Sequence, residues 1–391
     1  MDFVPANEHP LDPFPHYERM REAAPVFHDE QSGSWHVFRY EDVQRVLSDH
    51  ARFSSRMGGD DPSETGQLFA SSLITTDPPR HRQLRSLVTQ AFTPKAVDAL
   101  APRISALTEE LLEGIASTGT ADLIRELAYP LPVIVISELM GIPAGDRDRF
   151  KQWSDVIVSQ TQTGAANEDH HSTNVEMTEY FLNLIEQRRS RPGNDLISNL
   201  LSAEIDGQKL SVLELLGFCS LLLVAGNETT TNLIGNAVLC FSEVPGTIDR
   251  LLKEPSLLPQ AIEEVLRFRS PVQSMYRVAV ADTMLGDVPI PAGAPLVAWI
   301  GSANRDERQF PRPAEFDIDR DQIRHLAFGH GIHFCLGAPL ARLEARIALE
   351  ALLSRLPGLT VSPGAHLERM DSTIIYGLKS LPAQWSVRQP F

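Results

Sequence analysis

Apolar residues recur with helical spacing along most of the chain. From residue 80 to about residue 241 the pattern is mostly helical, and residues 211–243 predict one helix roughly 50 Å long. A second clear amphipathic pattern follows residue 337, where Leu340 and Ile347 fall on one face. Each of these segments is apolar enough to pack in a protein core.

The pattern changes to short strands near both ends of the chain. Residues 24–30 and 34–40 are strand-like, and residues 275–297 form short runs separated by glycine and proline. The last segment, residues 380–391, is strand-like as well. Helices dominate and no alternation of strand and helix is seen, so the pattern predicts a mainly α fold with small β-sheets.

A glycine-rich loop, FGHGIHFCLG at Phe328–Gly337, precedes the helix that begins after residue 337. Its glycines allow close approach of the backbone to a ligand. Cys335 therefore lies just before a helix N-terminus, where the helix dipole stabilises a thiolate. A lone cysteine is more often a small core residue. The nearby histidines also suggest zinc, but the chain lacks the paired ligands that are typical of structural zinc sites.

The loop resembles the haem-binding signature of the cytochrome P450 family. The resemblance covers nearly the whole chain and implies one haem-thiolate monooxygenase domain over residues 1–391, with the triangular-prism fold of that family. It implies haem b (iron protoporphyrin IX), with Cys335 as the axial thiolate and metal ligand. The haem-contacting residues that it implies are Ala225, Phe328, Gly331, His333, Cys335 and Gly337.

The long helix carries a polar interruption, Ala225-Gly226-Asn227-Glu228-Thr229-Thr230, between apolar runs. A solvated stripe on a surface helix is the simpler interpretation. Apolar residues fill nearly every face on both sides, however, so the helix is expected to be buried, and a buried Glu228 is costly without a partner or a role. The family resemblance assigns Glu228 and Thr229 to catalysis, as the acid and alcohol that deliver protons during oxygen activation.

Glu264 and Arg267 lie three residues apart on a predicted helix and so face the same side. An exposed ion pair of this kind contributes little to stability. The pair also matches the family's ExxR motif, and Arg320 stands where the family supplies a third partner. The resemblance implies a structural role for all three, in holding the segment that supports the Cys335 loop.

The resemblance also implies residues around the haem. It assigns His81, Arg85, Arg277 and His333 to the haem propionates. The expected substrate contacts are apolar and carry no fixed charge, which predicts a hydrophobic substrate. These expected contacts are Leu68, Phe69, Val224, Ala225, Val272, Met275, Ile374 and Ile375.

Composition restricts the remaining possibilities. The chain has 391 residues and three cysteines, too few for a disulfide framework, which fits a reducing cytoplasm. Its formal net charge of −16 argues against nucleic acid as a partner. The N-terminal segment shows no signal peptide or membrane anchor pattern, and the apolar run at 215–225 is too short to span a bilayer. A cytoplasmic monomer is expected.

The expected activity is insertion of one oxygen atom from O2 into a fatty acid, terpenoid or steroid. Electrons would come from a ferredoxin or flavodoxin with an NAD(P)H-dependent reductase, since the chain shows no fused flavin or iron–sulfur domain. A peroxide-driven peroxygenase is a second possibility, although specialised peroxygenases replace the acid–alcohol pair that is present here. A haem-thiolate sensor or carrier without catalysis is a more remote third possibility.

Overall fold

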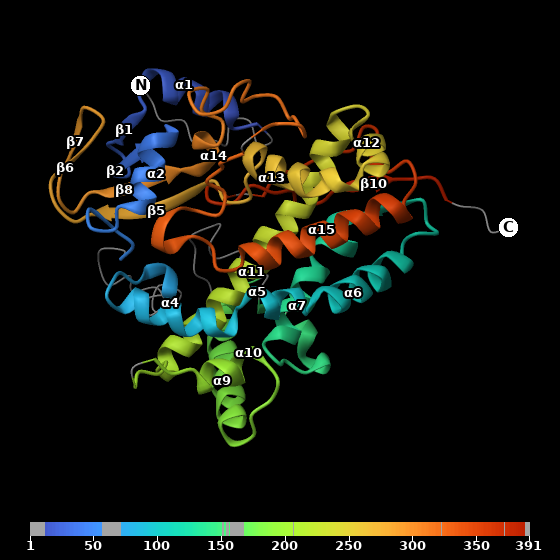
Figure 1. The fold of residues 1–391 in the computed structure, drawn as a ribbon, viewed down its shortest axis with the longest axis horizontal. Helices are drawn as coiled ribbons and strands as arrows, with labels where there is room; N and C mark the ends of the chain where they lie inside the picture. The colour runs from blue at the N-terminus through green and yellow to red at the C-terminus, as the bar shows by residue number, and fades with distance from the viewer. Residues whose placement is uncertain are drawn as a thin grey trace. The chain divides into compact units, whose positions relative to one another are not determined.

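A computed structural model describes residues 12–56, 72–150, 152–153, 156, 168–205, 207–321, 323–370 and 372–387. Its backbone forms two compact units. The first contains Met1–Phe53, Leu100–Leu131 and Thr229–Phe391, and the second contains Ser54–Ala99 and Pro132–Glu228. The long helix α11, Val212–Glu243, begins in the second unit and ends in the first (Figure 1).

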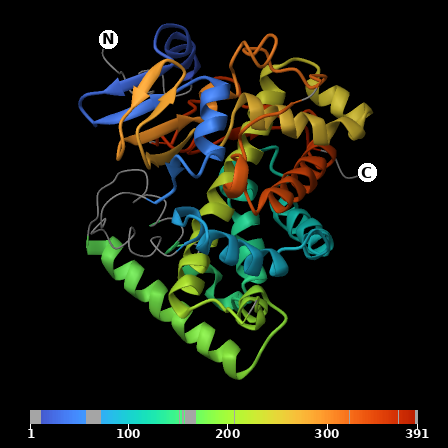
Figure 2. The same cartoon turned by 60° about the vertical axis from the view of Figure 1, so that its left-hand side comes forward.

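A five-stranded sheet near the N-terminus organises the first unit. Its strand order is β1-β2-β8-β5-β3. β1 pairs antiparallel with β2, β2 pairs parallel with β8, and β8 pairs antiparallel with β5 (Figure 2). The strands are β1 Val26–Asp29, β2 Ser34–Val37, β3 Phe53–Ser54, β5 Ser274–Ala279 and β8 Pro295–Trp299. Paired residues of β2 and β8, such as Trp35 and Leu296, are 261 positions apart in the chain and become neighbours in one sheet.

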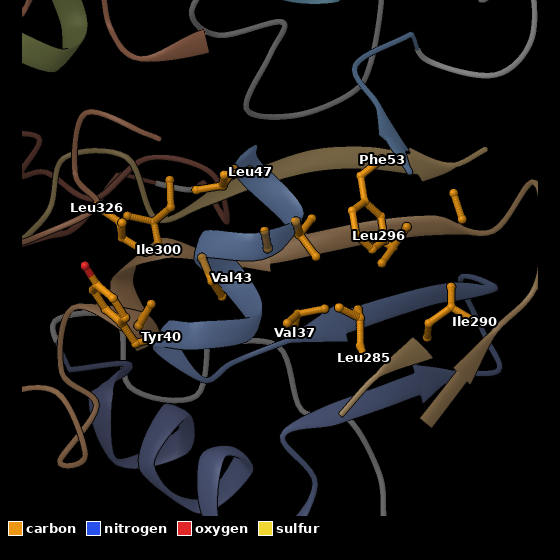
Figure 3. Packing of buried hydrophobic residues seen from close by; sticks show 14 of the residues in the cluster. Val37, Tyr40, Val43, Leu47, Phe53, Leu285, Ile290, Leu296, Ile300 and Leu326 are labelled. Atoms are coloured by element: carbon orange, nitrogen blue, oxygen red, sulfur yellow. The ribbon is translucent and has the colours of Figure 1, made fainter. Parts of the chain in front are cut away.

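Helix α2, Tyr40–Ser48, packs its apolar face on this sheet. Leu47 lies beside Ile300, and Val43 and Leu296 belong to the same hydrophobic cluster (Figure 3). Val43 and Leu296 are completely buried. Burial of such side chains stabilises the packing of α2 on the sheet by about 1.5–3 kcal/mol each.

The other sheets of the first unit are small. They are formed by β4 Thr120–Asp122, β9 Thr360–Val361 and β10 Pro382–Gln384, and by β6 Thr283–Leu285 with β7 Val288–Ile290. The helices of this unit are α1 Phe14–Ala23, α2, α6 Ala101–Glu113, α12 Thr247–Lys253, α13 Leu258–Phe268, α14 Ile300–Ala303 and α15 Ala338–Arg355, with turns η3 Ile124–Ala128, η5 Pro255–Leu257 and η6 Gly331–His333. α15 packs on α6, α12 and α13.

The second unit is helical. Its helices are α4 Arg80–Ala91, α5 Pro94–Asp98, α7 Pro130–Leu139, α9 Glu168–Ser190, α10 Leu196–Ser202 and the first half of α11, with turns η2 Leu73–Thr75 and η4 Ala144–Asp146. α10 packs on both α4 and α9. Asp195 caps α10 by accepting from the Ser198 backbone N–H at 2.8 Å. Arg80 at the start of α4 pairs with Glu214 of α11 through two hydrogen bonds, 2.7 and 2.6 Å long.

Helix α11 is unbroken over 32 residues. An 18-residue window within it has a mean hydropathy of 1.4, and half of that window is buried in the protein. Length and composition alone would allow such a helix to cross a membrane, but the core helix of a globular protein meets the same criterion. Gly226 and Gly235 allow close packing, since a Cβ at either position would lie within 3 Å of an isoleucine side chain.

The prediction of a mainly α fold with small sheets is confirmed, as are the helices predicted at 211–243 and after residue 337. One expectation was incomplete. Residues 80–241 were expected to be mostly helical, but β4 interrupts them and pairs with β10 near the C-terminus. A three-residue strand is too short to show a periodic pattern, and its partner lies about 260 residues away.

Candidate functional site

The loop around Cys335 is folded tightly on itself. The Cys335 backbone N–H donates to the Phe328 carbonyl at 2.8 Å, and the Phe334 N–H donates to the Gly331 carbonyl at 3.1 Å. Gly331 has a φ of +72°, and a Cβ there would lie 2.8 Å from the Ser48 Cα. Only glycine fits this combination of left-handed backbone and close approach to α2.

The structure separates Cys335 from the other two cysteines. Cys219 and Cys240 are buried, whereas Cys335 is half-buried and lies three residues before the first residue of α15. Burial raises the pKa of the Cys219 thiol to about 12 and also raises the pKa of Cys240. These two side chains therefore remain protonated thiols, which leaves Cys335 as the cysteine placed to act as a thiolate ligand.

Three charged residues form a buried network in the first unit. Glu264 and Arg267 on α13 are both 0% exposed and are joined by two hydrogen bonds of 2.7 Å. Arg320 donates through Nε to both carboxylate oxygens of Glu264, at 3.0 and 3.1 Å. The Asp317 backbone N–H also donates to Glu264 at 3.0 Å. We call Glu264, Arg267 and Arg320 the Glu264 network.

The remaining donors of the Glu264 network bind the backbone that leads toward the Cys335 loop. Arg267 donates to the carbonyls of Asn304, Pro313 and Glu315. Arg320 donates to the carbonyls of Pro311, Arg312 and Glu315. Asn304 in turn accepts through its side-chain oxygen from the Leu326 N–H at 2.7 Å, two residues before the loop begins. The network thus fixes an irregular segment that has no strand or helix of its own.

The polar interruption of α11, residues 225–230, is partly exposed to solvent. Glu228 is 6% exposed and Asn227 is also buried, whereas Thr229 is half-buried and Ala225 is exposed. Ala225 and Thr229 are four residues apart, so they share one face of the helix. An acid and an alcohol are therefore adjacent in the chain at a part of α11 that its neighbours do not cover completely.

Asn232 lies about one turn after Thr229 on α11. It was not among the site residues predicted from the sequence. It is buried, and within the described ranges neither atom of its amide has a hydrogen-bond partner. Its amide lies against Gly377, where a Cβ would come within 1.8 Å of the Asn232 oxygen. The available signal was the spacing in the chain, because Asn232 lies three residues after Thr229.

The residues expected around a haem rim fall in both units. His81 is buried and Arg85 half-buried, one turn apart on α4 of the second unit. In the first unit, Arg277 on β5 is buried and donates through Nη1 to the Tyr276 carbonyl at 2.7 Å. His333 ends the short turn η6 and is half-buried.

Four of the expected substrate contacts lie near one another in the first unit. Val272 forms an antiparallel bridge with Ile375, and the Gln273 N–H donates to the Ile374 carbonyl at 2.7 Å. Met275 follows on β5 and packs with Val272 against the sheet core. Val224 and Ala225 belong to the second unit, and Leu68 and Phe69 lie outside the described residues.

The histidines near Cys335 do not form a zinc site. Within the ranges that the structure describes, no group of three or more His, Cys, Asp or Glu side chains could hold a metal ion. His325 contacts the Glu263 carboxylate through Nε2 at 3.0 Å, and its Nδ1 accepts from the Ala327 N–H at 3.2 Å. Both ring nitrogens are thus occupied within the protein.

Comparison with known proteins decides between the possible families. The model of the family described as Cytochrome P450 matches residues 17–387. The chain belongs to the cytochrome P450 family. It is 45% identical over 383 residues to cytochrome P450 109 of Bacillus spizizenii, with 96% of this chain and 92% of that protein covered. It is 41% identical over 374 residues to erythromycin C-12 hydroxylase of Saccharopolyspora erythraea, with 93% and 92% covered.

A solved P450 structure confirms the fold. CYP109E1 from Bacillus megaterium in complex with testosterone is 45% identical and superposes with a TM-score of 0.88, covering 96% of this chain and all of that one. The chain is therefore a P450 monooxygenase, an oxidoreductase of a family that binds haem through a cysteine thiolate and uses redox partners. The half-buried Cys335 on a glycine loop fits such a group, because a thiolate needs close backbone approach and access to iron.

The contribution of the Glu264 network to the stability of the protein can be tested by substitution. In Glu264→Gln, two buried guanidinium groups lose their carboxylate partner, so the free energy of unfolding should fall by about 3–5 kcal/mol. Urea unfolding followed by circular dichroism measures this change. Glu350→Gln is the control, because Glu350 is 43% exposed and pairs with Arg346 on the same helix; its effect should stay within about 0.5 kcal/mol. Equal effects of the two substitutions would show that the network is not essential.

Proposed function

We propose that this P450 holds haem b through Cys335 and inserts one atom of dioxygen into a hydrophobic substrate. The second oxygen atom leaves as water, which consumes two electrons and two protons for each substrate molecule oxidised. The observation that carries the proposal is the position of Cys335, the half-buried cysteine on a tight glycine loop beside the N-terminus of α15. Bound haem would supply the centre at which dioxygen is reduced.

The residues proposed to hold the haem fall into two groups. Phe328, Gly331 and Gly337 would form the loop around the Cys335 thiolate, and Ala225 of α11 is proposed as a further haem contact. His81, Arg85, Arg277 and His333 would bind the two propionates, because carboxylates in a partly buried site require hydrogen-bond donors or cations. The whole chain, residues 1–391, would act as one haem-thiolate domain.

Glu228 and Thr229 are proposed as the catalytic pair that delivers protons. Glu228 is buried at 6% exposure and adjacent to Thr229 in the chain, and its carboxyl would relay protons from solvent toward the Thr229 hydroxyl. The Thr229 hydroxyl can donate a hydrogen bond and receive the next proton from the acid side. Ala225, one turn before Thr229, is exposed, so its small side chain would leave space for small molecules beside this pair.

The substrate is proposed to be a steroid, with fatty acids and terpenoids as further candidates. Val272, Met275, Ile374 and Ile375 are apolar and half-buried, which suits a ligand that makes few polar contacts. The homologue CYP109E1 binds testosterone. Val224 and Ala225, together with Leu68 and Phe69, are proposed to complete the set of substrate contacts.

The electrons are proposed to come from a separate ferredoxin or flavodoxin with an NAD(P)H-dependent reductase, in the cytoplasm and with the enzyme as a monomer. A peroxide-driven reaction is the alternative, and a haem-thiolate sensor or carrier is the remote one. The presence of both Glu228 and Thr229 favours the dioxygen reaction, because a peroxide-driven enzyme has less need of a proton relay.

The thiolate assignment can be tested by spectroscopy. Reduced protein with carbon monoxide should show the red-shifted Soret band that is characteristic of the family, and Cys335→Ala should abolish it because alanine cannot ligate iron. Cys219→Ala is the matched control and should retain the band, since Cys219 lies buried in α11. A band that survives in Cys335→Ala would remove Cys335 from the site.

The proton relay can be tested by the coupling of oxygen consumption to product. Thr229→Ala should release most of the reducing equivalents as peroxide, because protons no longer reach the reaction in the correct order. Thr231→Ala serves as the control, since it lies two positions further along and on another face of α11. Peroxide, oxygen and product are measured together. Unchanged coupling in Thr229→Ala would exclude Thr229 from the relay.

The substrate class can be tested by ligand-induced Soret shifts. Testosterone, a long-chain fatty acid, an ionone-type terpenoid and a macrolide are titrated separately. The steroid should give the largest shift at the lowest concentration, and Ile375→Asp should weaken its binding because a charge enters an apolar surface. A shift with the macrolide alone would contradict the proposed class.

A further inference from the structure

A second set of charged side chains lies next to the Glu264 network in the first unit. Glu263, the residue before Glu264, accepts two hydrogen bonds from Arg342 of α15, from Nε at 2.6 Å and from Nη2 at 2.8 Å. His325 contacts the same carboxylate through Nε2 at 3.0 Å. We call Glu263, His325 and Arg342 the Glu263 network.

The Glu263 network contacts the loop that carries Cys335. The Arg342 guanidinium lies 4.4 Å above the centroid of the Phe328 ring, and the His325 ring centroid lies 5.9 Å from it. The carbonyl of Phe328 accepts the Cys335 N–H at 2.8 Å. Phe328 therefore links the two: its ring contacts the charged network, and its carbonyl accepts the hydrogen bond from the Cys335 N–H.

The chemistry of the network favours a fixed geometry. Burial alone would raise the pKa of Glu263, but hydrogen bonds from Arg342 and His325 lower it to about 2. The carboxylate is therefore charged at neutral pH. Arg342 uses its planar fork on the carboxylate and its face on the Phe328 ring at the same time, which a lysine cannot do.

We propose that Glu263 and Arg342 are positioning residues for the Cys335 thiolate. Glu263 orients the Arg342 guanidinium, Arg342 holds the Phe328 ring, and the Phe328 carbonyl fixes the Cys335 backbone. The two consecutive glutamates of α13 thus have different roles. Glu264 binds the segment before the loop, and Glu263, through Arg342, positions the loop itself. This inference rests on the proposed role of Cys335 as the haem ligand.

The competing interpretation is an ordinary ion pair between α13 and α15. The Arg342 side chain is 38% exposed, and exposed pairs contribute little. Such a pair would affect overall stability at most and would leave the loop unchanged. The two interpretations therefore differ in what happens at Cys335 while the protein remains folded.

The experiment compares Glu263→Gln, Arg342→Gln and Arg342→Lys with the control Arg346→Gln. Arg346 lies one turn further on α15, is 40% exposed and pairs with Glu350. The holoenzyme is reduced, bound to carbon monoxide and held in urea below its unfolding transition. The rate at which the red-shifted Soret band is lost should rise roughly tenfold in both Gln variants, since a charged pair and a cation–π contact are removed.

Arg342→Lys keeps the charge but loses the fork and the stacked plane. It should behave like Arg342→Gln, whereas an effect of net charge alone would be rescued by lysine. Loss of the band at the control rate in Glu263→Gln and Arg342→Gln would overturn the proposal, as would loss that only follows global unfolding by circular dichroism.

Hydrogen–deuterium exchange separates this inference from the proposed function. The fragment containing residues 328–336 should exchange roughly tenfold faster in Glu263→Gln than in Arg346→Gln, because Arg342 no longer holds Phe328, whose carbonyl accepts the Cys335 N–H. If the unmodified protein lacks the thiolate band, the proposed function fails, and the positioning role of the network fails with it. If that band is present but neither exchange nor band loss changes in the variants, only the positioning role fails.

Discussion

The structure of the first unit depends on the burial of a charged group that must be fully hydrogen-bonded. Glu264 and Arg267 are inaccessible to solvent, and an uncompensated charge in that position would cost several kcal/mol. The protein meets this requirement with Arg320 and with five different backbone carbonyls between residues 304 and 315. An irregular segment that could not hold its shape through helix or sheet hydrogen bonds is thus fixed by side chains.

The same helix carries the adjacent carboxylate of Glu263, which points to different partners. Neighbouring residues on a helix diverge by about 100°, so α13 can serve two segments with two consecutive glutamates. One carboxylate is buried with two arginines, and the other is shared by His325 and Arg342 at the edge of the unit. Arg342 and His325 also contact the ring of Phe328, the first residue of the glycine-rich loop that carries Cys335.

Several parts of the site could be predicted because their signals are local. The shared helical face of Glu264 and Arg267 follows from their spacing, and the burial of residues 211–243 follows from apolar residues on nearly all sides. Gly331 could be expected to take a special conformation, but its contact with Ser48 depends on how α2 packs. Arg342 gave no signal, because a charged residue at this position is typical of a solvated helix face, and His325 was considered only as a possible zinc ligand. The spacing of Asn232 after Thr229 was visible in the sequence, but its contact with Gly377 was not, since a helix pattern cannot show which segment packs against it.

The sequence by itself determined the mainly helical fold, the position of Cys335 just before a helix and the identity of the family, because these depend on residues close together in the chain. The tertiary structure decided which charges meet. Glu263 pairs with a residue 79 positions away and Arg320 with one 56 positions away. Such pairings depend on how helices and loops pack, and packing is set by the sum of many apolar contacts, which no short stretch of sequence contains.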